Sequence, residues 1–190
     1  GEGATGGIIG WSEGLIYQTA MTGNISSIDG FAHLGGVVGY NAGGSVICQS
    51  LSKGDVSQVS FDSFDGGHVG GLVGMQAGTI TNSYATGNVS DSISGYSGGL
   101  VGYMYYGEQT VTNSYSIGTV SNGEGLIYGN GDNVSSSFWD VETSGQTTSN
   151  GGIGKTTVDM QTPSTFIDAG WSTTIWSLTN GDYPELTWEE

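Results

Sequence analysis

Apolar residues recur along this chain in a unit built from a Gly-Gly pair, two apolar residues and two further short apolar stretches. The units begin at Gly6, Gly35, Gly70, Gly98 and Glu124, which are 29, 35, 28 and 26 residues apart. The differences in spacing fall in the polar links between units. Repetition with variable links is typical of a solenoid, in which each turn keeps its core and a loop varies.

Alternate residues near the middle of each unit form three columns, and a spacing of two places them on one face of a strand. We expect these columns to point inward: Ile16, Ile47, Ile80, Val111 and Val134; then Gln18, Gln49, Asn82, Asn113 and Ser136; then Ala20, Leu51, Tyr84, Tyr115 and Phe138. The intervening small polar residues would then point outward. Amides stacked along the axis could satisfy one another's hydrogen bonds inside the core.

Two more strands per turn are predicted, one from the apolar pair after Gly-Gly and one from a valine or isoleucine after a Gly-x turn. The fold class is therefore all-β, a parallel β-solenoid of four to five turns with three strands in each. The Gly-Gly pairs, such as Gly70-Gly71, have two explanations. Either the backbone takes a positive φ at a corner, or neighbouring turns approach too closely for a Cβ atom.

The pattern changes after residue 137, which divides the chain into repeats over 1–137 and a capping segment over 138–190. Thr156 or Thr157 is a candidate helix cap, Pro163 must break or start a helical turn, and Asn180-Gly181 suggests a hairpin. Three of the five tryptophans fall in this segment: Trp171, Trp176 and Trp188. We expect these large side chains to cover the open end of the core.

The segments GGLVGMQAGTITNSYATGNVS, from Gly70, and GGLVGYMYYGEQTVTNSYSIGTVS, from Gly98, resemble the GLUG-motif repeats of large bacterial and archaeal surface proteins. The tail from SSSFWDVETSG to GDYPELTW resembles the segment that commonly closes such arrays. The unit at Glu124 departs from the motif, because Tyr128 stands where the second glycine would be. The resemblance implies an adhesin-like protein of the cell surface without assigned chemistry.

Charge narrows the classes of partner. Two basic residues face 18 acidic ones, for a formal net charge of −16. Nucleic acid and anionic membrane surfaces are unsuitable partners, because both require clustered Lys or Arg, and no apolar run is long enough for a membrane span. Cys48 is a single cysteine without a partner for an internal disulfide. Glycosylation sequons begin at Asn24, Asn88 and Asn133 and matter only in a glycosylating host.

Metal binding is a candidate chemistry. His33 and His68 each precede a Gly-Gly pair by two residues, so they are expected to stack in adjacent turns, with Asp62 or Asp65 as further ligands. Calcium is a second possibility, because the loops SFDSFDGG and GNGDN, the latter containing Asp132, combine carboxylates with backbone carbonyls. Neither loop has an EF-hand or nonapeptide calcium pattern.

Catalysis is not expected. Polysaccharide-cleaving β-helix enzymes need two carboxylates about 5–10 Å apart, and Asp62 with Asp65, or Asp140 with Glu142, would be the candidate pairs. The chain contains no Arg, so a lyase would lack its usual cationic groups.

The function expected from these features is that of an extracellular structural or adhesive module, and the alternative is a carbohydrate-binding or polysaccharide-degrading β-helix protein. Exposed aromatic residues could contact carbohydrate or another surface protein: Trp11, Tyr103, Tyr105 and Tyr106. The first repeat begins near the N-terminus without a covering segment, which leaves its strand edges open. We therefore expect end-to-end association, either with neighbouring repeats of a longer chain or with another copy in a filament.

Overall fold

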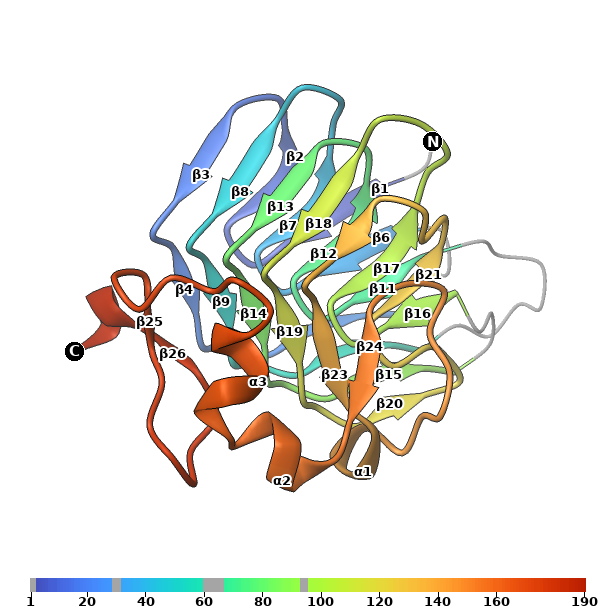
Figure 1. Ribbon diagram of the computed structural model, residues 1–190. Coiled ribbons are helices and arrows are strands. Elements are labelled where there is room, and N and C mark those ends of the chain that lie inside the picture. The colour runs from blue at the N-terminus through green and yellow to red at the C-terminus, as the bar shows by residue number, and fades with distance from the viewer. Residues whose placement is uncertain (1–2, 29–31, 60–66, 93–95) are drawn as a thin grey trace.

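A computed structural model describes residues 3–28, 32–59, 67–92 and 96–190. The fold is all-β, a coil of short strands whose successive turns stack in parallel as a β-solenoid (Figure 1). The predicted fold class is therefore confirmed. Two sheets contain four strands, two contain five and one contains six. The number of turns differs slightly from the predicted four to five.

Five strands make each full turn, and each belongs to a different sheet. Sheet A contains β1 (Gly3–Gly6), β6 (Ala32–Gly35), β11 (Val69–Gly70) and β16 (Ser97–Gly98). Sheet B contains β2 (Ile9–Ser12), β7 (Val38–Asn41), β12 (Val73–Gln76), β17 (Val101–Met104) and β21 (Ile127–Gly129). Sheet C contains β3 (Leu15–Tyr17), β8 (Val46–Cys48), β13 (Thr79–Thr81), β18 (Thr110–Thr112) and β22 (Val134–Ser135).

The other two sheets complete the turn. Sheet D contains β4 (Ala20–Met21), β9 (Leu51–Ser52), β14 (Tyr84–Ala85), β19 (Tyr115–Ser116), β23 (Phe138–Asp140) and β24 (Ile153–Lys155). Sheet E contains β5 (Ile25–Ser27), β10 (Val56–Gln58), β15 (Val89–Asp91) and β20 (Val120–Ser121). The prediction of three strands per turn is wrong, because the Gly-Gly pair separates sheet A from sheet B and a second corner separates sheet C from sheet D.

That second corner is made by the amide column. Its members take the left-handed backbone conformation: Gln18, Gln49, Asn82, Asn113 and Ser136 have φ of 48°, 49°, 48°, 48° and 46°. Asn tolerates this conformation better than most residues with a side chain. A left-handed residue interrupts the alternation of a strand, so the residues after it change face.

The inward amide column is therefore a prediction that the structure corrects. Gln18 is exposed, and Gln49, Asn82 and Asn113 are only half-buried. The serines that follow, which were expected outside, are buried instead: Ser50, Ser83, Ser114 and Ser137. They form a ladder in which the Ser83 hydroxyl accepts from the backbone N–H of Ser50 at 3.1 Å and donates to the carbonyl of Thr81 at 2.9 Å.

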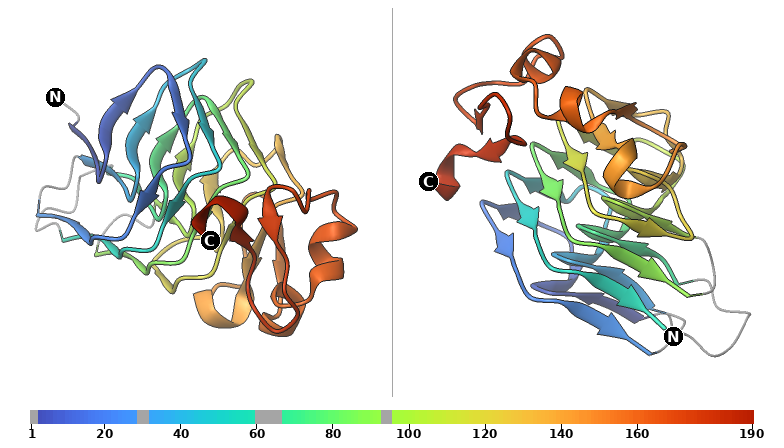
Figure 2. Two further views of the ribbon diagram at one scale, coloured as in Figure 1. Left: turned by 90° about the vertical axis from the view of Figure 1, so that its left-hand side faces the viewer. Right: turned by 90° about the horizontal axis from the view of Figure 1, so that it is seen from below.

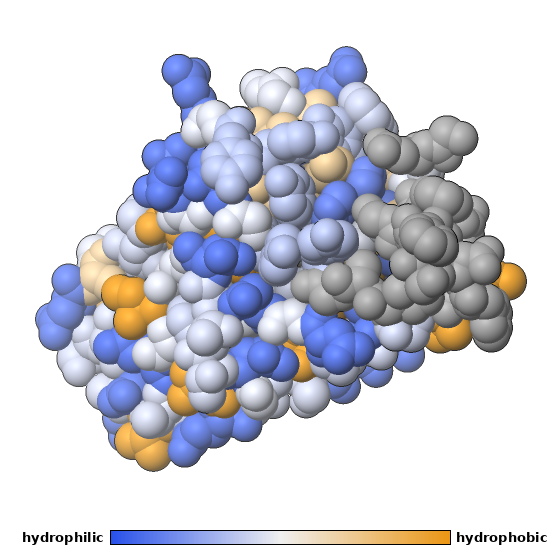
Figure 3. All heavy atoms as spheres, turned by 90° about the vertical axis from the view of Figure 1, so that its right-hand side faces the viewer, coloured by the Kyte–Doolittle hydropathy of each residue, from blue (hydrophilic) through white to orange (hydrophobic). Residues whose placement is uncertain are grey.

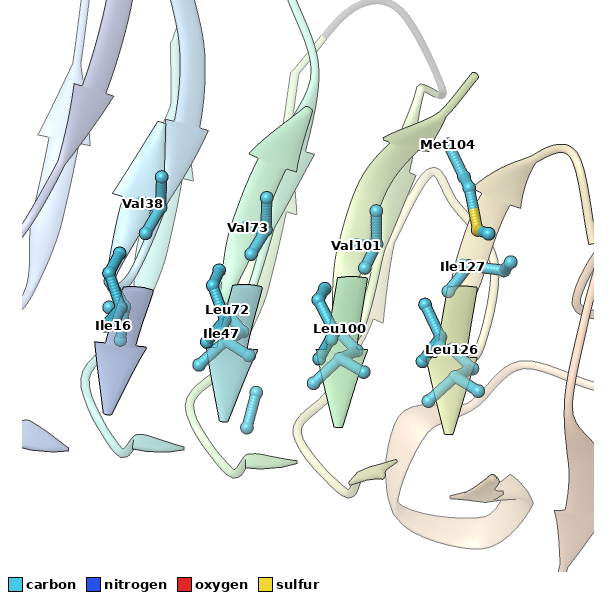
Figure 4. Packing of buried hydrophobic residues seen from close by; sticks show 14 of the residues in the cluster. Ile16, Val38, Ile47, Leu72, Val73, Leu100, Val101, Met104, Leu126 and Ile127 are labelled. Carbon is cyan, nitrogen blue, oxygen red and sulfur yellow. The ribbon is translucent and has the colours of Figure 1, made fainter. Parts of the chain in front are cut away.

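The first column does line the core. Ile16, Ile47, Ile80 and Val111 are buried, and Val134 is half-buried against the same cluster. Equivalent residues of successive turns lie one above another beside Leu72, Leu100 and their neighbours (Figure 4). The third column behaves differently: Ala20 is exposed, and the buried members lie outside the coil with the C-terminal segment packed on them: Leu51, Tyr84, Tyr115 and Phe138.

Close backbone approach explains the glycines of the repeat. A Cβ atom on Gly71 would lie 2.2 Å from the carbonyl oxygen of Gly99 in the next turn. One on Gly74, in sheet B, would lie 2.7 Å from the carbonyl carbon of His33 in sheet A. Neither glycine has a positive φ. Of the two explanations that the sequence left open, the structure therefore supports tight packing.

The C-terminal segment contains α1 (Val141–Ser144), α2 (Thr157–Met160), α3 (Pro163–Ile167), β25 (Trp176–Ser177), β26 (Glu185–Leu186) and η1 (Thr187–Glu189). As predicted, Thr156 caps α2, Pro163 begins α3, and β25 and β26 pair as an antiparallel hairpin. The aromatic-rich part does cap apolar residues, but along the side of the coil and not over its open end (Figure 2).

Residues 139–152 close the last turn instead. Trp139 is buried in the solenoid core and lies against Gly125. The Ser149 hydroxyl accepts from the backbone N–H groups of Leu126 and Ile127 at 3.3 and 3.1 Å. Strands β23 and β24 extend sheet D beyond residue 137, so the predicted domain boundary does not coincide with the end of the sheet.

Candidate functional site

A groove runs over sheets A and B near the Gly-Gly corner. We call it the ring groove, and its volume is about 600 Å³. It is lined by His33, His68, Met75, Tyr96, Tyr103, Tyr105, Tyr106, Tyr128, Gly129 and Asn150. A smaller hollow of about 140 Å³ shares three of these residues, His33, Met75 and Tyr105, and extends the groove to Trp11 and Tyr40.

Strand register produces the rows of side chains in the groove. In sheet B, Trp11 pairs with Tyr40, Tyr40 with Met75, and Met75 with Tyr103. Each of these residues directly follows the third glycine of its repeat, the last one in the pattern Gly-Gly-x-x-Gly. Because that glycine packs against the backbone of sheet A, as Gly74 does at His33, the sheet A row is brought beside the sheet B row.

The rings contact one another along the coil. Trp11 and Tyr40 have ring centroids 4.3 Å apart, and those of His68 and Tyr103 are 4.6 Å apart. Tyr128 continues the row into the last turn, with its ring 5.1 Å from that of Tyr96. The groove therefore presents rings from the first turn to the last.

A histidine pair stands at the centre of the groove. His33 and His68 stack in adjacent turns, as predicted, with ring centroids 4.8 Å apart and Nδ1 atoms 2.9 Å apart. Burial, together with the neighbouring His33, lowers the pKa of His68 to about 4. His68 is therefore uncharged at neutral pH. Burial and the neighbouring Tyr105 raise the pKa of Tyr40, so that side chain is neutral too.

Of the predicted metal ligands, the described part of the chain brings together only His33 and His68. Asp62 and Asp65 lie outside the described residues. Asp132 is exposed in a turn, where its backbone N–H donates to Asn130 Oδ1 at 3.1 Å. Within residues 3–28, 32–59, 67–92 and 96–190, no three His, Cys, Asp or Glu residues are grouped to hold a metal. Metal and calcium binding stay predictions.

The Asp140 and Glu142 pair is engaged in structural hydrogen bonds. Asp140 is buried and caps α1, accepting from the backbone N–H of Glu142 at 2.8 Å. Its other oxygen accepts from the hydroxyls of Thr157 at 2.8 Å and Tyr183 at 2.6 Å. Glu142 accepts from the backbone N–H of Thr157 at 2.7 Å. These bonds give both carboxylates a role in joining the C-terminal segment to the coil.

The first turn has an open end. Its strands β1 to β5 each occupy the edge of a sheet. Ile8 is 48% exposed, although it belongs to a column whose other members are fully buried: Val37, Leu72, Leu100 and Leu126. Leu15 and Tyr17, on β3, are 69% and 51% exposed. The end of the apolar core is therefore bare at the first turn and covered at the last.

Sequence reasoning expected four exposed aromatic residues, of which Trp11, Tyr105 and Tyr106 are exposed and Tyr103 is half-buried. It missed Tyr40, Met75 and Tyr128 as neighbours in the same groove. Tyr40 and Met75 could have been found, because both follow the third glycine of the repeat. Tyr128 stands in place of that glycine, and only the shifted register between β17 and β21 brings it beside Tyr103.

Comparison with known families agrees with this geometry. Residues 65–90, which span most of the third turn, match the family described as "The GLUG motif". The chain carries the GLUG motif. The resemblance of the repeats to GLUG proteins is thus confirmed.

A relative of this chain occurs in Evansella cellulosilytica, where it is described as "Putative Gly-rich membrane protein". The two are 36% identical over 121 residues, which are 63% of this chain and 12% of the relative. No solved structure matches the chain. In the part of the chain that the structure describes, no helix is long and apolar enough to cross a membrane.

Proposed function

We propose that this chain is a non-catalytic, extracellular module that gives a cell-surface protein both length and an adhesive face. The GLUG motif, the solenoid fold and the description of a much longer relative as a membrane protein support this proposal. The module would act as one length of a longer solenoid, in which each turn is stabilised by the turn before and the turn after it.

The observation that carries the proposal is the exposure of Ile8. A residue of a core column is normally covered on both sides along the axis, and Ile8 is covered on one side only. The backbone edges of β1 to β5 add unpaired groups that another turn would satisfy. We therefore propose that a preceding turn of a longer chain covers the first turn.

A head-to-tail filament of identical copies is the second candidate, because the same open edge could accept another copy. The last turn is already covered by Trp139 and residues 142–152, and the Ser149 hydroxyl occupies the backbone N–H groups of Leu126 and Ile127. A second copy could not extend these ladders without moving that segment. This favours a preceding turn over a filament.

A tandem chain tests the proposal. A second copy of residues 6–34 is placed directly before Gly6, so that Leu34 runs into Gly6 as it natively runs into Gly35. We expect the tandem chain to have a higher free energy of unfolding than the native chain. In the native chain, Ile8→Ala should lower the free energy of unfolding only a little. In the tandem chain, the same substitution in the original copy should lower it by about 2 kcal/mol or more, as at a buried site.

Equal costs of Ile8→Ala in the two chains would contradict a covered first turn. Sedimentation velocity separates the second candidate. A filament predicts association of the native chain that grows with concentration and weakens in Leu15→Lys, because a charge on an edge strand opposes pairing.

The alternative of a polysaccharide-degrading enzyme has less support. The described lining of the ring groove contains rings, Met75, Gly129 and Asn150, but no carboxylate. Asp140 and Glu142 are occupied in joining the C-terminal segment. The ring groove therefore fits binding better than cleavage, and it is the natural adhesive face of the module.

A further inference from the structure

We propose that the ring groove binds a neutral polysaccharide whose chain lies along the solenoid axis. This inference rests on the proposed adhesive function and names its ligand class. The observation behind it is the succession of rings from Trp11 in the first turn to Tyr128 in the last. Met75 interrupts the sheet B row, and the rings of His33 and His68 bridge the gap.

The chemistry of the lining suits a sugar. Tyrosine and tryptophan combine a large apolar body with a polar tip. A pyranose ring has the complementary character, because it carries C–H groups on its faces and hydroxyls around its rim. The faces can lie on aromatic rings, whose faces are electron-rich. The hydroxyls can meet the phenol groups of Tyr105 and Tyr106 and the side-chain amide of Asn150, all of which line the groove.

The shape of the groove suits a chain more than a single small molecule. The main hollow and the smaller one share His33, Met75 and Tyr105, so the lined surface is continuous over several turns. Its main volume of about 600 Å³ is within the range of ordinary ligand sites. Tyr105 is 42% exposed and Tyr106 is 78% exposed, so both rings are accessible to a ligand.

Charge selects the neutral class of polysaccharide. Lys53 and Lys155, the two basic residues of the chain, are not among the groove residues. The groove histidine His68 is uncharged at neutral pH, and the formal net charge of the chain is −16. Uronate or sulfate groups would therefore meet repulsion without a cationic partner. On the face shown in Figure 3, hydrophobic residues are scattered among hydrophilic ones.

Native gel electrophoresis of the full chain through gels that contain polysaccharide tests the proposal. The chain is negatively charged and migrates in a native gel, and binding to the polysaccharide would slow this migration. Neutral probes are mixed-linkage β-glucan, xyloglucan and galactomannan, and anionic probes are polygalacturonate and alginate. We expect at least one neutral probe to retard the chain and neither anionic probe to do so.

Variants assign the binding to the groove. Tyr105→Ala and Tyr106→Ala should each lower the affinity for the polysaccharide, as measured from the retardation, by about tenfold or more, because loss of an aromatic anchor commonly does so. Tyr17→Ala is the matched control, because Tyr17 is a 51% exposed tyrosine on sheet C, outside the groove. It should leave retardation unchanged. Melting curves of the three variants verify that each remains folded.

Three results would overturn the proposal: no retardation by any neutral probe, equal retardation by the anionic probes, or equal loss of binding in Tyr17→Ala. None of these would affect the tandem-chain test, which measures the cover of the first turn. A failure of the sugar ligand is therefore distinguishable from a failure of the surface module.

Discussion

Tyr84 and Tyr115 stack on the outer face of sheet D, with ring centroids 4.9 Å apart and ring planes 7° from parallel. The Tyr115 hydroxyl donates to the carbonyl of Pro184 at 2.6 Å, and the Tyr84 hydroxyl donates to the carboxylate of Glu189 at 2.8 Å. Both rings lie beneath Trp176. The C-terminal segment is thus joined to several successive turns at once.

Tryptophan bonds extend this connection along the coil. Trp171 Nε1 donates to the carbonyl of Ser136 at 2.8 Å, Trp176 Nε1 to Asn82 Oδ1 at 3.2 Å, and Trp188 Nε1 to the carbonyl of Gln49 at 3.0 Å. Each acceptor is the left-handed corner residue of its own turn. The segment therefore follows the corners back from the last turn towards the first.

We predict that Trp176→Ala is strongly destabilising. Trp176 is 1% exposed and packs on Trp171, Tyr84 and Tyr115, so its loss leaves a large cavity. The free energy of unfolding should fall by about 3–5 kcal/mol, as measured by urea denaturation. Trp11→Ala, at a 59% exposed tryptophan, is the control and should change it by less than about 1 kcal/mol. Similar losses in both variants would contradict the packing described for the segment.

Glycine packing gives a second prediction. Gly71→Ala should cost about 3 kcal/mol or prevent folding, because the new methyl group would overlap the backbone of the next turn. Gly14→Ala is the matched change, because nothing lies within 4 Å of a Cβ atom at that position. It should be neutral within about 0.5 kcal/mol. Thermal unfolding followed by circular dichroism measures both, and a tolerated Gly71→Ala would show that the turns are not so close.

The serine ladder gives a third prediction. Ser83→Ala removes the acceptor of the Ser50 backbone N–H inside the core, and an unsatisfied buried group costs about 1–3 kcal/mol. Ser90→Ala, at an exposed serine of the same turn, should have little effect. Amide exchange at Ser50 should also become faster in Ser83→Ala. Unchanged exchange there would contradict the ladder.

The histidine pair predicts a dependence of stability on pH. The pKa of His68 is about 4 in the folded chain and about 6.5 when unfolded, so the unfolded chain binds more protons between these values. Stability should therefore be fully present above about pH 6.5 and fall by about 3 kcal/mol as the pH drops towards 4.

A variant isolates the contribution of His68. His68→Gln should reduce the slope of stability against pH between about 6.5 and 4, because it removes the imidazole whose pKa is lowered in the folded chain. Urea denaturation at several pH values measures the difference. Identical slopes would contradict the lowered pKa.

Repetition in the sequence was sufficient to predict the solenoid, because a column of apolar residues at fixed offset requires stacking. It predicted the core positions Ile47, Ile80 and Val111 and the stacking of His33 on His68. The amide column failed because alternation was assumed to continue through Asn82. A positive φ at Asn82 changes the face to which the following side chains point. Ser83 therefore lies inside the coil, and Tyr84 lies on the outer face of sheet D, where the C-terminal segment buries it.

The ring groove was only partly predictable. Their common position after the third glycine of the repeat relates Tyr40 to Tyr103, but nothing local in the sequence relates that column to His33 and His68. The two rows meet because glycines let sheets A and B approach, which is a tertiary contact. The position of the C-terminal segment was unpredictable for the same reason, since its tryptophans donate to corner carbonyls and amides far away in the sequence.

The central claim is that the chain is one length of a longer solenoid, in which a preceding turn covers the first turn. Hydrogen exchange of the first turn tests this claim most directly. In the native chain, amides of β1 to β5 should exchange much faster than those of β6 to β10, because edge strands lack a second neighbour. In the tandem chain, residues 32–34 of the added copy take the place of residues 3–5, and the amides of β2 to β5 in the original first turn should be protected like those of β7 to β10. Protection that is already equal in the native chain, or is unchanged in the tandem chain, would contradict the account.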